Sequence, residues 1–365
     1  MDKHFDYIVL GFGLSGAIFS YYLNKKYPEK KVLVIENNKY SLKNKTISFW
    51  KRKDSEIDFD NIISKRWSNV SVNTGKDKEY VLDKYEYCTV HGNQLYDYIF
   101  KEISSNNNIS FINDSVISIP LKNDKYFVQT TNNTYYAQTI FNSIYTQPKL
   151  NNKEIIKKQH FRGYRIKVDS DIFNPKTVSF MDFNNNDDWH FFYTLPYSKS
   201  EALVEEVSLN NINVGDLEKY IEDRYKVNKY NIEYIEQGCI PMTDYKFNRF
   251  DKNIVNIGVN GGGVKPSTGY AFNKILKQVD EYFNNKQYSN TSFYSLTDTL
   301  ILNIMEKYPN KLSIIFKNIL NNNIENIFEF LDEESNLFKI CKIGTRLIPV
   351  SNYFIKAYLY SIINR

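Results

Sequence analysis

The pattern of apolar and polar positions predicts an α/β chain that opens with a strand, a helix and a second strand. Phe5–Leu10 is a continuous apolar run typical of a buried strand, and the apolar residues of Ala17–Asn24 recur with helical spacing. Lys31–Ile35 is a second run of the strand type. Elements in this order predict a parallel βαβ unit.

The middle of the chain predicts two further sets of strands. Residues 109–142 alternate between apolar and polar positions, after an amphipathic helix at Gly92–Ile103. Residues 160–236 alternate in the same way, with a short helix at Leu217–Tyr225. Aromatic and apolar faces on these strands suit a sheet that covers a large hydrophobic ligand. Beyond residue 295 the apolar spacing becomes helical again, which predicts a helical C-terminal region.

Residues 258–270 contain an unusual concentration of glycine. Five of the 14 glycines of the chain lie here, namely Gly258, Gly261, Gly262, Gly263 and Gly269. Such density indicates a backbone that takes positive φ or approaches a ligand closely. A strand-like run, Asn253–Ile257, precedes the stretch, and Tyr270–Val279 follows it with helical spacing. This order presents backbone N–H groups to an anion; a tight surface turn is the alternative interpretation.

The first βαβ unit carries a second glycine pattern. Gly11, Gly13 and Gly16 lie between its first strand and its helix, and Glu36 ends the next strand, 20 residues after Gly16. This spacing is typical of a dinucleotide site, in which the glycines admit a pyrophosphate and the acid binds the ribose hydroxyls. A glycine turn in an unrelated βαβ unit is the alternative. With no second pattern of this kind downstream, one dinucleotide is expected.

Composition narrows the classes of partner. The net charge is +5, but lysines are scattered among acidic residues, which argues against nucleic acid and leaves an anionic membrane surface open. Cys88, Cys239 and Cys341 lack disulfide or zinc spacing, and the four histidines lack metal spacing. Because neither a signal peptide nor an apolar run of about 20 residues is present, we expect a cytoplasmic protein that is soluble or peripherally bound to a membrane.

Several segments in fixed order resemble those of one enzyme family. They are Gly11–Gly16, Thr46–Trp50, Phe161–Arg165, Met181–Phe183, Phe192–Ser198, Leu203–Leu209, Glu236–Met242 and Gly261–Tyr270. Together they resemble the flavin-dependent lycopene cyclases of carotenoid biosynthesis, of the bacterial and plant β-cyclase kind. The resemblance covers nearly the whole chain.

The resemblance implies a fold and a cofactor. A Rossmann-like FAD-binding domain (1–60, 85–150 and 237–295) is expected to interleave with an antiparallel β-sheet substrate domain (61–84 and 151–236), followed by a helical region (296–365). Besides the first glycine pattern and Glu36, the FAD contacts implied are Gln94, Val116, Gly258, Gly261, Gly262, Thr268 and Gly269. Ordinary flavoproteins carry an Asp after the strand-ending glycine, whereas Gly258 is followed by Val259 and Asn260. Lycopene cyclases likewise lack that Asp.

The same resemblance implies a redox-neutral cyclisation of lycopene that a carboxylic acid starts by protonating a double bond. Glu205 matches the family's essential acid, and burial would raise its pKa. Glu206, its neighbour, is expected to support it from the other face of the strand. Asp182, Glu236 and Tyr197 are secondary candidates. Reduced FAD would stabilise the carbocation, with NAD(P)H as a reductant.

Other functions stay open at this point. A flavin-dependent monooxygenase or a prenyl reductase on the same fold is one alternative, although the missing Asp argues against it. A non-catalytic flavin-fold scaffold is another. Arg346–Arg365 is apolar, rich in Tyr and bracketed by cations, which fits an interfacial helix and a core helix equally well. The exact polyene, the ring type and the oligomeric state do not follow from the sequence.

Overall fold

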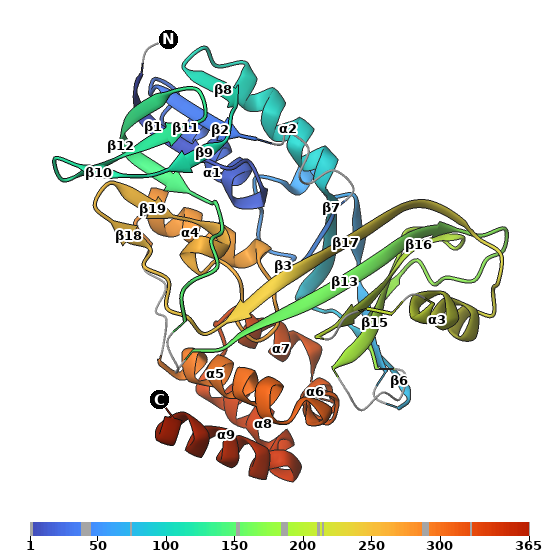
Figure 1. Ribbon diagram of the computed structural model, residues 1–365. Coiled ribbons are helices and arrows are strands. Elements are labelled where there is room, and N and C mark those ends of the chain that lie inside the picture. The colour runs from blue at the N-terminus through green and yellow to red at the C-terminus, as the bar shows by residue number, and fades with distance from the viewer. Residues whose placement is uncertain are drawn as a thin grey trace.

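The computed structural model describes residues 3–37, 45–73, 75–150, 154–183, 189–209, 212–213, 215–286, 292–321 and 323–364. The protein combines three β-sheets with helices in a mixed α/β fold (Figure 1). Arg365, one of the two cations that bracket the C-terminal segment, lies outside the described residues.

The first sheet contains the predicted βαβ unit, which the structure confirms. Its parallel core has the order β8, β2, β1, β12, β19. Its strands are β1 (His4–Leu10), β2 (Val32–Glu36), β8 (Ile109–Asn113), β9 (Val116–Ser118), β10 (Leu121–Lys122), β11 (Lys125–Thr130), β12 (Thr134–Asn142), β18 (Phe250–Asp251) and β19 (Ile254–Asn256). Helices α1 (Leu14–Lys26), α2 (Gly92–Ser104) and α4 (Phe272–Phe283) share an apolar core with this sheet.

The second sheet has seven strands in the order β17-β13-β16-β15-β14-β5-β6. They are β5 (Asn69–Asn73), β6 (Asp77–Val81), β13 (Ile156–Lys167), β14 (Thr177–Asp182), β15 (His190–Pro196), β16 (Glu201–Ser208) and β17 (Asn231–Thr243). The long β13 and β17 run toward the first sheet, as Figure 1 shows. One face of the second sheet packs on α3 (Asp216–Tyr225).

The opposite face of the second sheet is covered by the third sheet and by C-terminal helices. The third sheet has the order β3-β7-β4, made of β3 (Thr46–Arg52), β4 (Lys65–Trp67) and β7 (Tyr85–His91). The predicted helical region consists of α5 (Ser292–Lys307), α6 (Leu312–Leu320), α7 (Ile324–Leu331), α8 (Leu337–Arg346) and α9 (Ser351–Asn364). Short 3₁₀ turns are η1 (Asp60–Ile62), η2 (Gly258–Gly261), η3 (Pro309–Lys311) and η4 (Ile348–Val350).

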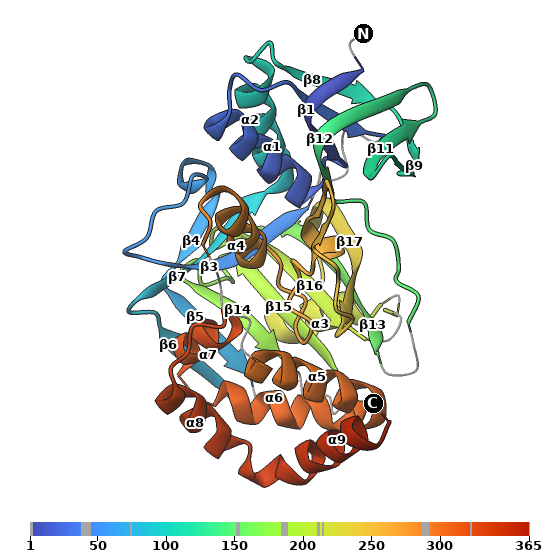
Figure 2. The same ribbon diagram turned by 90° about the vertical axis from the view of Figure 1, so that its left-hand side faces the viewer.

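Aromatic contacts hold this second layer together. The Trp189 ring of the sheet lies 4.3 Å from Phe316 of α6, and Trp50 of β3 stacks on Phe328 of α7 at 4.8 Å. These helices lie at the end of the molecule away from the N-terminus (Figure 2). Within the described residues, no helix combines the length and apolarity needed to cross a bilayer.

Candidate active site

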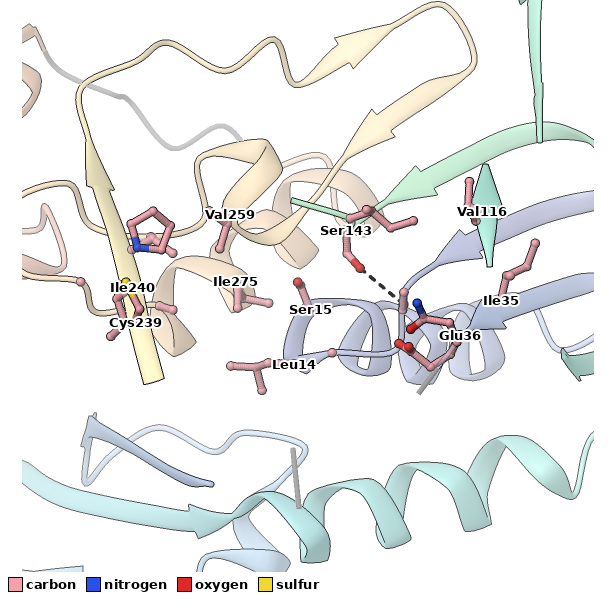
Figure 3. A pocket seen from close by; sticks show the side chains of 18 of the residues that line it. Leu14, Ser15, Ile35, Glu36, Val116, Ser143, Cys239, Ile240, Val259 and Ile275 are labelled. Carbon is pink, nitrogen blue, oxygen red and sulfur yellow. Dashed lines mark hydrogen bonds between the residues drawn. The ribbon is translucent and has the colours of Figure 1, made fainter. Parts of the chain in front are cut away.

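A cavity of about 530 Å³ lies between the first sheet and β17. Figure 3 shows Glu36 and Val116 toward one end and Cys239 and Ile240 of β17 toward the other. The lining residues are Gly11, Gly13, Leu14, Ser15, Ile35, Glu36, Asn37, Asp114, Val116, Ser143, Ile144, Cys239, Ile240, Pro241, Val259, Val264, Gly269, Ala271 and Ile275. Segments from both ends of the chain therefore form one elongated space.

The end near Glu36 has the features of a nucleotide site. Gly11 takes a φ of +82°, and a Cβ on Gly16 would lie 2.0 Å from the carbonyl oxygen of Gly11, so only glycine lets α1 pack this closely on the turn. A Cβ on Gly13 would meet nothing within 4 Å. The N-terminal end of α1 begins at Leu14 and attracts anions. Glu36 Oε2 accepts a hydrogen bond from the Phe12 N–H at 2.5 Å, which fixes the acid beside the turn.

The two glycine stretches predicted from the sequence meet beside Ser15, which lines the cavity. Gly258 has a φ of +61°, and a Cβ there would lie 2.1 Å from Ser15 Oγ at the start of α1. Gly261 is equally constrained, because its Cβ would lie 2.2 Å from the carbonyl oxygen of Asn256. The Thr268 hydroxyl is buried without a hydrogen-bond partner among the described residues. This unpaired hydroxyl, the helix end and the acid on β2 fit FAD.

The structure separates the predicted cofactor residues into two groups. Gly11, Gly13, Glu36, Val116 and Gly269 line the cavity, whereas Gly16, Gly258, Gly261, Gly262 and Thr268 shape or adjoin its walls. Gln94 of α2 does not line it. Its exposed side chain accepts a hydrogen bond from Ser64 Oγ at 2.6 Å, because this position of α2 faces the β4 side.

A pair of buried carboxyl groups lies on the second sheet. Glu205 of β16 and Glu236 of β17 are both registered opposite Gly163 of β13, which runs between them. Directly opposed residues point to the same face, so the two side chains meet across the glycine and contact each other. A Cβ on Gly163 would lie 3.0 Å from Glu205 Oε2. Because Gly163 has no side chain, the two carboxyl groups have the space to meet.

The surroundings of the pair favour at least one proton on it. Burial raises the pKa of Glu205 well above its ordinary value, and the charge of Glu236 raises it further. Burial also raises the pKa of Glu236, whereas hydrogen bonding from Thr46 opposes that rise. Glu236 Oε2 accepts from the Thr46 N–H at 2.7 Å, and Oε1 is buried without a donor from the rest of the described chain. A proton on Glu205 would supply that donor.

Tyrosine side chains surround the pair. Tyr193 of β15 lies opposite Glu205 and hydrogen-bonds to it, which partly offsets the rise in the pKa of the acid. Tyr87 hydrogen-bonds to Tyr270, whose ring lies 4.6 Å from that of Trp50. Aromatic faces in an apolar core stabilise a cation by roughly 0.5–2 kcal/mol each. The site therefore combines an acid whose pKa is raised with aromatic surfaces suited to a carbocation.

The other predicted acids lie on the opposite face of the same sheet. Because side chains alternate along a strand, Glu206 points away from Glu205, and its Oε1 lies 2.7 Å from His190 Nε2. Asp182 accepts a hydrogen bond from the Tyr220 hydroxyl of α3 at 2.8 Å. Tyr197 lies in another part of the site, with the Arg165 guanidinium 3.2 Å above its ring. The structure thus brings Glu236, and not Glu206 or Asp182, to Glu205.

The residues of this site that were not predicted from the sequence include Gly163, Tyr87 and Tyr270. A glycine inside a strand-like run, at Phe161–Arg165, was the available signal, since such a residue often marks a close approach of other groups. The two tyrosines gave no local signal, because they are distant in sequence from Glu205 and meet it only through packing.

Comparison with known proteins identifies the family. A family model described as lycopene cyclase protein matches residues 6–291. The chain belongs to the lycopene cyclase family. Helices α5–α9 lie beyond the matched range. No curated protein matches the sequence.

Solved structures similar to this lycopene cyclase family member share its fold. A geranylgeranyl bacteriochlorophyll reductase-like protein from Thermoplasma acidophilum has a TM-score of 0.62 at 12% identity, with 96% of this chain and 99% of that chain covered. The p-nitrophenol 4-monooxygenase of Pseudomonas putida has a TM-score of 0.56 at 11% identity, with 97% and 99% covered. At such identities the likeness shows the fold alone, which is the Rossmann-like fold of FAD-binding flavoenzymes.

Proposed function

We propose that the protein catalyses the redox-neutral cyclisation of the linear ends of lycopene to β-ionone rings, with Glu205 as the general acid. The observation that carries this proposal is the buried contact between Glu205 and Glu236, in which burial raises both pKa values and the charge of Glu236 raises the pKa of Glu205 further. A carboxylic acid that keeps its proton near neutral pH is what protonation of a double bond requires. Membership of the lycopene cyclase family supports the substrate class.

The proposed steps conserve atoms and electrons. The O–H bond of Glu205 breaks as a C–H bond forms at the terminal double bond, which leaves a carboxylate and a tertiary carbocation. The neighbouring double bond attacks the cation and closes the ring. A base of the site then removes one proton, so that the product has the mass of the substrate. Tyr193, hydrogen-bonded to Glu205, would hold the acid toward the substrate.

The cofactor of the proposal is FAD in its reduced form, with NAD(P)H as reductant. When bound, reduced FAD would supply negative charge that stabilises the carbocation. Gly11, Gly13 and Glu36 would hold its nucleotide end, and the Thr268 hydroxyl and the walls at Gly269 its other end. Since the cyclisation transfers no electrons, each turnover would consume no NAD(P)H once the flavin is reduced.

The proposed substrate also defines a location. Lycopene is a hydrocarbon that resides in bilayers, so we place the protein on the cytoplasmic surface of a membrane as a peripheral protein. The hydrophobic polyene and the membrane surface are its proposed partners, and nucleic acid is not among them.

The decisive experiment assays Glu205→Gln with lycopene in liposomes, anaerobically and with reduced FAD. Because Gln has nearly the shape of Glu but no acidic proton, we expect normal FAD binding and a loss of cyclised product of at least about 100-fold. Glu206→Gln is the matched control, since it removes the adjacent acid from the opposite face. Cyclisation by Glu205→Gln at the wild-type rate would refute the assignment.

Product mass separates this function from the alternatives. Cyclisation leaves the mass of the polyene unchanged, a monooxygenase would add an oxygen atom, and a prenyl reductase would add two hydrogens. A scaffold would return the substrate unaltered, with an unchanged chromatographic retention.

A further inference from the structure

The C-terminal helices expose an apolar surface. Six of the 18 exposed large apolar side chains among the described residues lie within residues 337–364. They form what we name the C-terminal apolar surface: Phe338, Ile348, Ile355, Tyr358, Leu359 and Ile362. Phe338 of α8 is 78% exposed and Ile355 of α9 is 58% exposed. Single exposed apolar residues are common, but a concentration of them marks an interaction site.

Helix α9 presents this surface in a regular way. Ile355, Tyr358, Leu359 and Ile362 occupy positions i, i+3, i+4 and i+7, so they share one face of the helix. Ala357 on the opposite face is 1% exposed, and its carbonyl oxygen accepts a hydrogen bond from Asn303 of α5 at 3.4 Å. Helix α9 is thus fixed to the protein along one side and leaves an apolar stripe on the other.

The charge of the same segment identifies what the surface fits. Residues 335–365 contain five basic residues and no acidic residue. The 47 basic residues of the chain less these five equal its 42 acidic residues, so the whole net charge of +5 resides in this segment. The five are Lys339, Lys342, Arg346, Lys356 and Arg365. Of these, Lys339 is paired with Glu329 of α7, whereas the side chains of Arg346 and Lys356 are exposed.

We propose that the C-terminal apolar surface, together with Arg346 and Lys356, docks the protein on a bilayer that contains anionic lipid. Apolar side chains enter the boundary between headgroups and acyl chains, and each cation near an anionic surface strengthens binding. Helices α8 and α9 lie at the far end of the molecule from the N-terminus in both views (Figures 1 and 2), and the six apolar side chains are exposed there.

This docking rests on the proposed function and extends it. It names the surface through which a polyene dissolved in the membrane would reach the protein. Helices α5, α6 and α7 share one apolar core with β16, the strand of Glu205. The docked end of the molecule therefore belongs to the layer that covers the acid pair. Neither α8 nor α9 lies within residues 6–291, the range matched to the family.

The test measures flotation of the full chain with vesicles of phosphatidylcholine alone and of phosphatidylcholine mixed with phosphatidylglycerol. We expect tighter binding to the anionic vesicles and a loss of that preference in about 1 M salt, where the screening length falls to about 3 Å. Arg346→Gln and Lys356→Gln should each weaken binding to anionic vesicles about 5-fold. Lys122→Gln, which removes an exposed cation from β10, is the matched control and should change nothing.

The apolar contribution is tested by Ile355→Ser combined with Leu359→Ser, which should weaken binding to both kinds of vesicle about 10-fold or more. Ile117→Ser combined with Leu121→Ser removes two exposed apolar side chains near the opposite end and is the control. Equal vesicle binding by the two double variants would overturn the proposal. A wild-type protein that floats with neither kind of vesicle would also overturn it. If the wild type is a dimer in solution and the Ile355→Ser, Leu359→Ser variant is a monomer, the surface binds a second copy of this chain and the membrane proposal is overturned.

A separate measurement distinguishes this proposal from the proposed function. With lycopene dispersed in detergent, the Ile355→Ser, Leu359→Ser variant should cyclise at the wild-type rate, whereas Glu205→Gln should bind anionic vesicles as the wild type does. Loss of cyclisation in detergent by the surface variant would contradict a role confined to docking.

Discussion

At the scale of single residues, the contact between Glu205 and Glu236 depends on a glycine in the strand between them. Gly163 separates Glu205 from Glu236 in the register of the sheet. The resemblance to a family indicated Glu205 before the structure was known. It ranked Glu236 only as secondary and omitted Gly163, because cross-strand neighbours follow from register, which local sequence does not specify.

The variant Gly163→Ala should disturb the pair without removing either acid. Its Cβ would lie 3.0 Å from Glu205 Oε2 and 3.1 Å from Leu203 Cδ1, so the carboxyl group has to shift. We expect cyclisation to fall at least about 10-fold and stability to fall by about 1–3 kcal/mol. Gly344→Ala is the control, because a Cβ there meets nothing within 4 Å. Undiminished cyclisation by Gly163→Ala would mean that the contact between the acids is unimportant.

The pH dependence of cyclisation should reveal the influence of Glu236 on Glu205. In the proposed mechanism Glu205 acts in its protonated form, so activity should be present below its raised pKa and be lost as the pH rises through that value. Glu236→Gln removes a charge that raises this pKa, while the Gln oxygen still accepts from the Thr46 N–H. The alkaline limb of the rate profile should therefore move to lower pH, with activity retained at acidic pH. An alkaline limb at the same pH in Glu236→Gln and the wild type would argue against an influence of Glu236 on the pKa of Glu205.

At the scale of elements, the sequence predicted those strands and helices that a local pattern defines. The opening βαβ unit, α2, α3 and the helical C-terminus are confirmed by the structure. The three-stranded sheet was not predicted as a unit, because β4 and β3 both pair with β7, which follows them at a distance. Pairings of that kind depend on long-range packing and not on periodicity.

A buried ion cluster links the second glycine stretch to the C-terminal helices. Lys265 is 1% exposed, and its Nζ lies 2.9 Å from Asp298 of α5 and 3.2 Å from Glu333, which follows α7. These carboxylates raise the pKa of Lys265 despite its burial, so the amine stays charged. The cluster thereby couples a wall of the cavity to helices that cover the acid pair.

Removal of this cation should unfold the protein more easily. Lys265→Ala leaves Asp298 without its cation in a buried site, whereas Glu333 keeps its ion pair with Lys274. We expect a loss of about 3–5 kcal/mol in the free energy of unfolding by urea. Lys199→Ala is the matched control, because its ion pair with Asp171 is exposed and contributes less than about 1 kcal/mol. Similar losses of unfolding free energy in the two variants would show that the buried cluster stabilises the protein no more than the exposed ion pair does.

At the scale of the whole molecule, the cavity joins parts that are far apart in the sequence. Its nucleotide end belongs to the first sheet and its other end to β17 and the second glycine stretch. A ligand that spans both ends stabilises the molecule more than one that fills a single end. The two glycine patterns predicted the walls of this cavity, but the distance between them required the fold.

Comparison of FAD with ADP should detect the two ends separately. We expect FAD to bind more tightly than ADP, as measured by the ligand-dependent shift of the thermal unfolding midpoint. Thr268→Val keeps the shape of the side chain but removes the unpaired hydroxyl. It should weaken FAD binding about 5-fold and leave ADP binding unchanged. An equal loss for both ligands would place Thr268 outside the flavin end.

The shared strand β17 has a consequence for engineering the product of the proposed cyclisation. Glu236 and Ile240 lie four residues apart on β17, so a fixed span of about 13 Å separates the acid from the cavity wall. Strand β17 runs without interruption through this span. The ring of Phe161 occupies the space above Gly238, between the two. Ring selectivity would therefore be redesigned most directly by changing the bulk of residue 161.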